Sequence, residues 1–579
     1  MKKVLCSLLV LLTAFSGHCN EEYTADREVL ARLNEGREVH FRNLLPAMHL
    51  TQPANGTYNN YELGFPSILT TSDPDLGIML YQLRNNIYTD RHFVFVDGKS
   101  VMTSKNWIRD HVHEMKAFCH WEYDLRSFLD FIIDTQREDG CYYELVKQID
   151  DRHWSYVNED CSVMYPEDNL ALVRLEIESD IEYMVVEGAL CYYKVTGDDE
   201  WLRRVLPRLE KGIDYLTSDP KRWDVARGLV KRGYTIDTWD FTYMPDAGTD
   251  RRITEGKTPM AIMHGDNSGA WQAMRQLAWM NRRFGNEAKA REWESRAATL
   301  RANIFKYLWN GRHFAHQLPL NVPAYDEFED VRLSLSNTYD INRGLTDLKQ
   351  SRSIIEEYQA RRDTTSAFAE WFTVDPPYDK FFIYKPGKYV NGAISPFTAG
   401  ELAKAAFNNG YEAYGWDIIQ RFEKMMQRDG TVYFLYSRTT GQSESKGAGP
   451  SAWGAAAVMS AIDEGLAGIC NSGCGYDEIH FCPRFPVTHY DELRYVTGYE
   501  LSHKVVDLRY VLRDNGMRYL LKSPAKSVKC HILLPEGRKC RTVLVNGEEV
   551  KFSNSRVAAS RYVDFDINPD GVVDMEVLF

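Results

Sequence analysis

The chain has 579 residues, of which 44% are hydrophobic, and its formal net charge is -13. A chain of this length can bury a large core and is expected to form more than one domain. Nucleic-acid binding requires a basic stripe, which neither the charge balance nor any segment of the sequence provides. The acidic balance fits a neutral or cationic ligand better than a polyanionic one.

The first residues have the pattern of an export signal. Lys2 and Lys3 precede an apolar run over 4–15 that is too short to span a bilayer, and polar residues follow it. The sequence predicts a signal peptide over 1–19 and a secreted or periplasmic protein. Cys19 leaves open a bacterial lipid anchor, although His18 stands where such motifs usually have a small residue. No later stretch is apolar enough for a transmembrane helix.

The body of the chain, over 20–483, alternates between less charged and more charged helical patterns. Apolar residues recur at helical spacing over 178–195, whereas 198–216 is amphipathic, with Trp201 and Val205 on its apolar stripe. The less charged helices are expected to begin near Trp107, Ser179, Asp266, Leu335, Gly392 and Ser451. With a helix over 25–39 completing the set, these pairs predict a mainly α fold, an (α/α)6 toroid; a solenoid of helix pairs is the alternative.

The pattern changes after about residue 484. Residues 505–510 alternate between apolar and polar, and 543–545 lead into Asn546-Gly547, a strong signal for a tight hairpin turn. The sequence therefore predicts a small C-terminal β-sandwich domain over 484–579. We expect it to pack on the helices and to contribute no catalytic group.

Polar clusters precede the less charged helices. They contain the candidate substrate-binding residues Trp107, Arg109, Asp110, Asp180, Asp237, Trp239, His264, Asn391 and Trp453. If these helices run parallel in a ring, the clusters meet on one face and form a concave site. Aspartates at helix starts are also ordinary caps, so capping is the alternative for Asp110, Asp180 and Asp266.

Carboxylates, an arginine and tryptophans together suit a carbohydrate, because sugars offer flat C–H faces to aromatic rings and hydroxyls to polar partners. The run Trp107-Ile108-Arg109-Asp110 resembles an element of glucoamylase-like (α/α)6 glycosidases. This resemblance implies that Arg109 and Asp110 hold the sugar, that Asp266 is the general acid and that Glu444 is the general base. Residues 391–396 and the C-terminal β-domain resemble bacterial α-L-rhamnosidases and other six-hairpin glycosidases.

Glycoside hydrolysis needs one protonated and one ionised carboxyl. The helix dipole lowers the pKa of an acid at a helix start, which weakens Asp266 as proton donor unless burial offsets it. Asp240, with Asp237 beside it among aromatic residues, is the rival acid, and Glu370 is a rival base. The prediction is an exo-acting, inverting glycoside hydrolase that acts on a carbohydrate substrate.

Two other classes of function stay open. One is a polysaccharide lyase or unsaturated uronyl hydrolase on the same toroid, which would need a more basic site. The other is a glycan-binding protein without catalysis. No nucleotide-binding or metal-binding motif stands out, and Cys470, Cys474 and Cys482 lack a clear fourth ligand, so no cofactor or metal is predicted.

Overall fold

The computed structural model describes residues 69–150, 162–235, 238–242, 252–381, 384–443, 450–569 and 571–579. The predicted signal peptide, the helix expected over 25–39, Asp237 and Glu444 lie outside these residues. Within them, no helix combines the length and the apolar character needed to cross a membrane.

Six helices pack in a closed order of neighbours. They are α4 (Ile108–Phe118), α6 (Ile181–Thr196), α8 (His264–Arg283), α10 (Ser336–Asn342), α12 (Pro396–Asn408) and α14 (Ala452–Ser460), which a π-helical turn (Ala461–Leu466) extends. Each contacts the next one in chain order, and α14 contacts α4. The contact is closest between α12 and α14, where a Cβ on Gly400 would lie 2.3 Å from the backbone carbon of Ala457. Nearly every residue of these two helices is buried, which explains their low charge.

A second set of helices covers the first from outside. It consists of α3 (Pro74–Thr89), α5 (Ser127–Asp134), α7 (Asp199–Leu216), α9 (Glu287–Leu308), α11 (Leu348–Thr364) and α13 (Glu412–Asp429). In α7, the stripe that includes Trp201, Val205 and Leu209 is buried, and the charged residues between them face outward. Among the described residues, α3 packs on α4, α13 and α14, and thus takes the place that the sequence assigned to 25–39.

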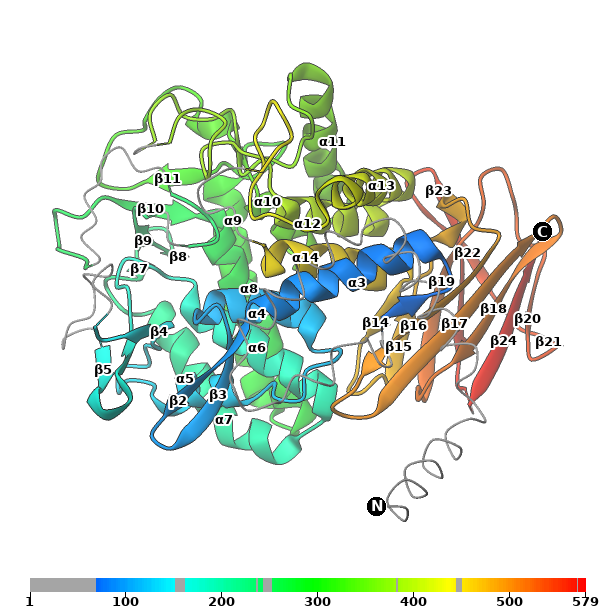
Figure 1. Ribbon diagram of the computed structural model, residues 1–579, viewed down its shortest axis with the longest axis horizontal. Coiled ribbons are helices and arrows are strands. Elements are labelled where there is room, and N and C mark those ends of the chain that lie inside the picture. Colours follow the sequence, from blue (N-terminus) through cyan, green and yellow to red (C-terminus); the bar gives the residue numbers. More distant parts are fainter. Residues whose placement is uncertain are drawn as a thin grey trace, which may run out of the picture.

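Short sheets lie at the ends where the inner helices begin (Figure 1). Two are three-stranded, with the orders β4-β6-β5 and β11-β10-β9, and three are two-stranded, with the pairs β2-β3, β7-β8 and β12-β13. Their strands are β2 (Arg91–Val96), β3 (Lys99–Ser104), β4 (Leu145–Gln148), β5 (Ser162–Tyr165), β6 (Leu170–Val173), β7 (Trp223–Asp224), β8 (Leu229–Val230), β9 (Arg232–Gly233), β10 (Met260–Met263), β11 (Gln317–Pro319), β12 (Leu333–Ser334) and β13 (Val374–Asp375).

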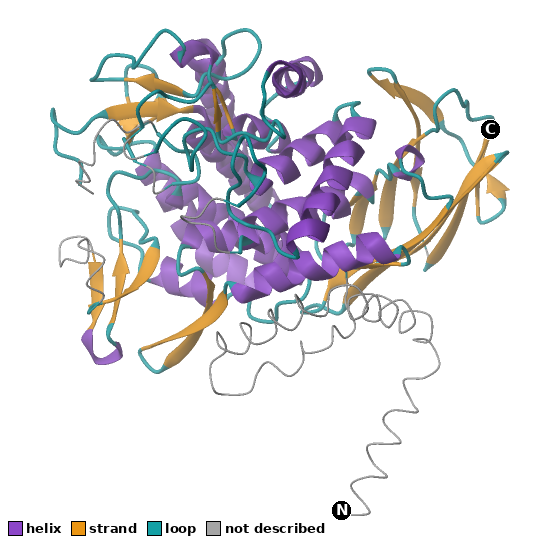
Figure 2. Cartoon of the chain, turned by 45° about the horizontal axis from the view of Figure 1, so that its top comes forward, coloured by secondary structure: helices purple, strands orange, loops and turns teal. Residues whose placement is uncertain are grey.

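Two larger sheets occupy the opposite side of the helices (Figures 1 and 2). One has the order β1-β16-β17-β18-β24-β20-β21 and the other β14-β15-β19-β23-β22. Their strands are β1 (Thr70–Thr71), β14 (Ile469–Asn471), β15 (Glu478–Phe481), β16 (Glu492–Tyr499), β17 (Lys504–Arg513), β18 (Gly516–Lys522), β19 (Ser527–Leu533), β20 (Thr542–Val545), β21 (Glu548–Glu549), β22 (Ser553–Val557), β23 (Ser560–Ile567) and β24 (Val572–Leu578). The sheets thus include strands that precede residue 484, and the boundary at 484 stays a prediction.

The two large sheets contact each other through buried side chains. Phe481 of one sheet meets Tyr519 of the other edge to face, with ring centroids 5.6 Å apart. The predicted hairpin is present: Asn546 and Gly547 have φ of 53° and 81° and connect β20 to β21. At the helices, Ser560 donates to the carboxylate of Glu412, the first residue of α13, over 2.6 Å, so the β-region is joined to the helical body.

Candidate functional site

The N-terminal ends of the inner helices gather the polar clusters that the sequence singled out. Asp110 lies in the first turn of α4, Asp180 directly precedes α6, and Asp266 lies in the first turn of α8. None of these starts uses an aspartate side chain as its helix cap: the capping residues of α4, α6 and α8 make no side-chain cap hydrogen bond. The aspartates therefore have other partners.

Arg109 is the centre of a buried cluster. Its guanidinium donates to both oxygens of Asp180, at 2.9 Å in the longer contact, and also to Glu178. All three side chains are at most 3% exposed. Burial acts to raise the pKa of Asp180, but the Arg109 charge outweighs it and holds the pKa below its usual value. Two carboxylates therefore bind the Nε and Nη2 groups of Arg109, and direct contact between this arginine and a sugar stays a prediction.

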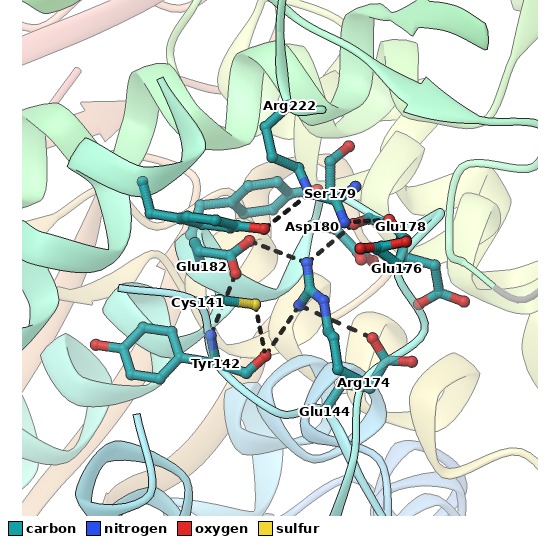
Figure 3. A network of polar contacts seen from close by, with 12 residues as sticks. Cys141, Tyr142, Glu144, Arg174, Glu176, Glu178, Ser179, Asp180, Glu182 and Arg222 are labelled. Carbon is teal, nitrogen blue, oxygen red and sulfur yellow. Dashed lines mark hydrogen bonds and ion pairs between the residues drawn. The ribbon is translucent and has the colours of Figure 1, made fainter. Parts of the chain in front are cut away.

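A second arginine extends this cluster behind α6 (Figure 3). Arg174 donates to the backbone oxygen of Glu178 at 2.9 Å and forms ion pairs with Glu182 at 3.4 Å and Glu144 at 3.9 Å. Burial, and then the neighbouring Glu178 carboxylate, raise the pKa of Glu144 well above its usual value. No local pattern points to Glu144 or Arg174, because the pairing of β4 with β6 brings them together from separate segments of the chain.

Asp266 is held on both of its oxygens. Ser179 donates to one oxygen at 3.0 Å, and Tyr183 to the other at 3.3 Å. Arg232 of β9 forms an ion pair with it at 3.4 Å, and this arginine also donates to Thr238, which in turn donates to Asp180. Burial raises the pKa of Asp266 to about 6 against the effect of Arg232. The carboxyl is thus a buried structural anchor, and it presents no free oxygen to a substrate.

Asp240 has a different environment. It is 0% exposed, and neither of its carboxylate oxygens makes a hydrogen bond with any of the described residues. A Cβ on Gly265 would lie 2.5 Å from Asp240 Oδ2 and 2.9 Å from Ser336 Oγ, so only glycine at the start of α8 leaves room for this carboxyl. Burial raises the pKa of Asp240, although His264 and Arg232 oppose it. Burial thus outweighs His264, Arg232 and the Ser336 hydroxyl, all of which favour the charged form.

His264 supports this region but has no free nitrogen. Nδ1 lies 2.6 Å from Asp340 Oδ2, and Nε2 lies 2.9 Å from Ser334 Oγ. Burial acts to lower the pKa of His264, but the Asp340 carboxylate outweighs it and raises the pKa. The predicted contact between His264 and a substrate is therefore corrected: the ring fixes the starts of α8 and α10 relative to each other.

Asp110, at the N-terminal end of α4, is half-buried. It stands beside Trp107, which is also half-buried, at the start of α4. Burial raises the pKa of Asp110 to about 6, although Lys105 and Arg109 oppose it. Lys105 Nζ lies 3.3 Å from Asp90, a residue that also accepts a hydrogen bond from the first backbone N–H of α14. Trp107 and Asp110 are thus both partly open to solvent at the start of α4.

The other predicted aromatic platforms are core residues. Trp239 is 0% exposed and donates to Tyr183 OH at 2.7 Å, while Trp453 is 5% exposed and donates to Tyr339 OH at 2.9 Å. Asn391 is buried as well, and its amide bonds the backbone of Tyr378 in both directions at 2.8 Å. In this structure the three side chains hold the inner helices and the loop before α12, and their predicted contact with a substrate stays a prediction.

The rival base Glu370 is also occupied. Arg421 binds its two oxygens at 2.7 Å and 2.9 Å, and Tyr414 donates to it as well. Such a bidentate pair is a structural contact. Among the described residues, no group of three or more His, Cys, Asp or Glu side chains is arranged to hold a metal ion.

Comparison with known proteins identifies the fold. No family model and no curated protein matches the sequence. Among solved structures, an α-L-rhamnosidase from Dictyoglumus thermophilum has a TM-score of 0.57 and 11% identity, covering 88% of this chain and 50% of that one. A family 78 rhamnosidase of Bacillus sp. GL1 has a TM-score of 0.53 and 15% identity, covering 81% and 43%. An α-L-rhamnosidase from Streptomyces avermitilis has a TM-score of 0.51 and 12% identity, covering 88% and 42%.

At these identities the likeness establishes the fold alone. The chain has the fold of six-hairpin glycosidase-like enzymes, which confirms the resemblance predicted from the sequence. It spans half of the length of these rhamnosidases or less.

Proposed function

We propose that this protein is a glycoside hydrolase whose catalytic face is formed by the N-terminal ends of the inner helices. The observation that carries the proposal is the buried Asp240 carboxyl, which has no hydrogen bond to the described residues and whose pKa burial raises, on a face where Trp107 and Asp110 are half-buried. The closed order of helix contacts supports the finer proposal that the six pairs form an (α/α)6 toroid. The solved rhamnosidases share this fold.

Asp240 rather than Asp266 is the general acid in this proposal. A proton donor needs an oxygen that can approach the glycosidic oxygen, and both oxygens of Asp266 are bound by Ser179, Tyr183 and Arg232. Asp240 has no such partners among the described residues. Burial raises its pKa, and that shift favours the protonated form from which a carboxyl donates to a leaving oxygen.

Glu444 is our candidate for the general base, because it stands eight residues before α14 in the sequence. In an inverting mechanism it would activate a water molecule on the side of the sugar opposite Asp240. The two carboxyls would then lie roughly 6.5–9.5 Å apart. Trp107 and Asp110 would hold the terminal sugar of an exo-cleaved chain. We further propose export from the cytoplasm, guided by 1–19, with a lipid anchor at Cys19 as the alternative to a free secreted or periplasmic form.

The test is a comparison of leaving groups. Wild type and Asp240→Asn are assayed on aryl-glycosides, including α-L-rhamnosides, that carry either a dinitrophenyl or an unactivated leaving group. Loss of a general acid should lower turnover about 10²–10⁴-fold on the unactivated substrates. The dinitrophenyl substrates should be affected far less, because their leaving group departs without protonation.

Asp514→Asn, in the exposed turn between β17 and β18, is the matched control and should keep wild-type turnover. Proton NMR of the sugar product, recorded before its anomers interconvert, shows whether the anomeric configuration is inverted or retained. Equal losses by Asp240→Asn on both kinds of leaving group would contradict its role as acid. A retained anomeric configuration would contradict inversion.

A further inference from the structure

The helical body contains a cavity at the end opposite the catalytic face. It has a volume of about 440 Å³, within the range of small-molecule sites. Its walls come from the later turns of α4, α6 and α8, from α12, from the turn that follows α14, and from β14 and β15. Both of these strands belong to the large sheets, which lie on the side of the helices away from the short sheets (Figure 1).

An aromatic layer separates this cavity from the catalytic face. His113 stacks on Trp453, with ring centroids 4.3 Å apart, and it also meets Trp239 at 5.8 Å and Tyr339 at 5.4 Å. These residues are at most 5% exposed. Lys116, which lines the cavity, places its ammonium 4.8 Å from the centroid of the Tyr339 ring. The cavity is therefore a compartment of its own rather than the floor of the catalytic site.

The charges of the cavity wall balance. The wall contains three lysines and three acidic residues, which are Lys116, Lys194, Lys404, Glu187, Asp463 and Glu464. Lys404 pairs with Glu464, and Lys116 pairs with Glu401, at 2.5 Å, while Lys194 donates to the backbone oxygen of Asn471 at 3.2 Å. A wall without net charge favours a neutral ligand, and a wall so rich in polar groups disfavours an apolar one.

The wall of the cavity carries uncharged and charged polar groups from neighbouring helices, and one of them has no hydrogen-bond partner among the described residues. Gln276 Oε1 is buried without a hydrogen bond. Glu187 of α6 and Gln272 of α8, on the neighbouring helices, line the same space. An amide offers both a donor and an acceptor, and a carboxylate accepts up to four hydrogen bonds. Donors and acceptors of this kind, facing one cavity, match the hydroxyl groups of a polyol.

We propose that this cavity is a second carbohydrate-binding site, which takes a neutral mono- or disaccharide between Glu187, Gln272, Gln276 and Lys194. The site is distinct from the catalytic face and does not depend on Asp240. A sugar bound here would contact α4, α6 and α8 together with β14, and so would join the helical body to the large sheets.

The experiment measures the stoichiometry and affinity of binding by isothermal titration calorimetry, with L-rhamnose, D-glucose, D-mannose and their disaccharides as probes. The full chain is used in four forms: wild type, Gln276→Phe, Glu187→Gln and Asp240→Asn. Gln276→Phe fills the cavity and should abolish binding there, whereas Glu187→Gln should weaken it about tenfold, the effect of about 1.4 kcal/mol. Asp240→Asn should leave it unchanged.

Gln427→Phe, on the exposed side of α13, is the matched control for the added ring and should bind as wild type does. Circular dichroism and the melting temperature check that each variant is folded. The proposal is overturned if no probe binds, or if folded Gln276→Phe binds every probe like wild type. Should the protein hydrolyse no glycoside while the cavity binds sugar as described, the proposed function fails and the second site stands.

Discussion

Replacing the buried Glu144 by glutamine, which cannot ionise, should stabilise this protein. The gain in the free energy of unfolding should grow as the pH rises. Glu144 is 0% exposed, and neither of its oxygens accepts a hydrogen bond from the described residues. Burial and the neighbouring Glu178 raise its pKa well above the usual value of 4.5. The folded state therefore holds a proton on Glu144 at a pH where the unfolded chain has lost it.

The sign follows from proton linkage. Above about pH 4.5 the folded state binds more protons than the unfolded state, so the free energy of unfolding falls as pH rises, until the folded pKa is passed. The slope is about 1.4 kcal/mol per pH unit, so a span of two units costs about 2.7 kcal/mol. That is a large share of a total stability of about 5–15 kcal/mol. Glutamine has nearly the shape of the protonated acid but does not titrate. Glu144→Gln therefore removes this fall in the free energy of unfolding with pH.

The assay measures the free energy of unfolding of wild type and Glu144→Gln in urea, at several pH values from about 5 to about 8. In this range the linkage argument predicts that the difference between the two proteins changes with pH. The stability advantage of the variant should grow with pH. Glu401→Gln is the matched control with the opposite sign, because Lys116 outweighs burial and lowers the pKa of Glu401. That variant should lose stability at neutral pH, and the loss should shrink as pH falls below about 4.5. A difference for Glu144→Gln that is constant across pH, or a destabilised variant, would refute the reasoning.

Three further outcomes follow from the site. Asp266→Ala leaves Arg232 buried without the carboxylate of its ion pair and should lower the free energy of unfolding by about 3–5 kcal/mol. Urea unfolding measures this loss. A loss below about 1 kcal/mol, which is typical of exposed pairs, would contradict the role of Asp266 as an anchor. Gly265→Ala would place a methyl group 2.5 Å from Asp240 Oδ2, so a folded variant should lose turnover on unactivated glycosides, and full turnover would argue against Asp240. Deleting 484–579 removes the strands that bind α13 through Glu412 and should yield insoluble protein; a soluble, fully active truncation would refute this.

Local pattern was sufficient to predict the helices and the turns. The apolar stripe of α7 and the Asn546-Gly547 hairpin both follow from contacts within a few residues of the chain, where spacing and turn chemistry decide. The position of the polar clusters at the starts of the inner helices could also be predicted, since helices that run parallel around a ring present their N-termini on one face. The resemblance in residues 107–110 and 391–396 added the fold family.

Only the tertiary structure decided what each residue of these clusters does. Asp240 and Asp266 look equivalent in the sequence, yet Arg232 and Tyr183 reach Asp266 from other segments and leave Asp240 unpaired. Trp239 looks like a surface platform in a loop, but His113, which precedes it by 126 residues, and Tyr339, which follows it by 100, pack against its ring. These are contacts between distant parts of the chain, and burial, pairing and pKa depend on which groups meet, which no local pattern encodes.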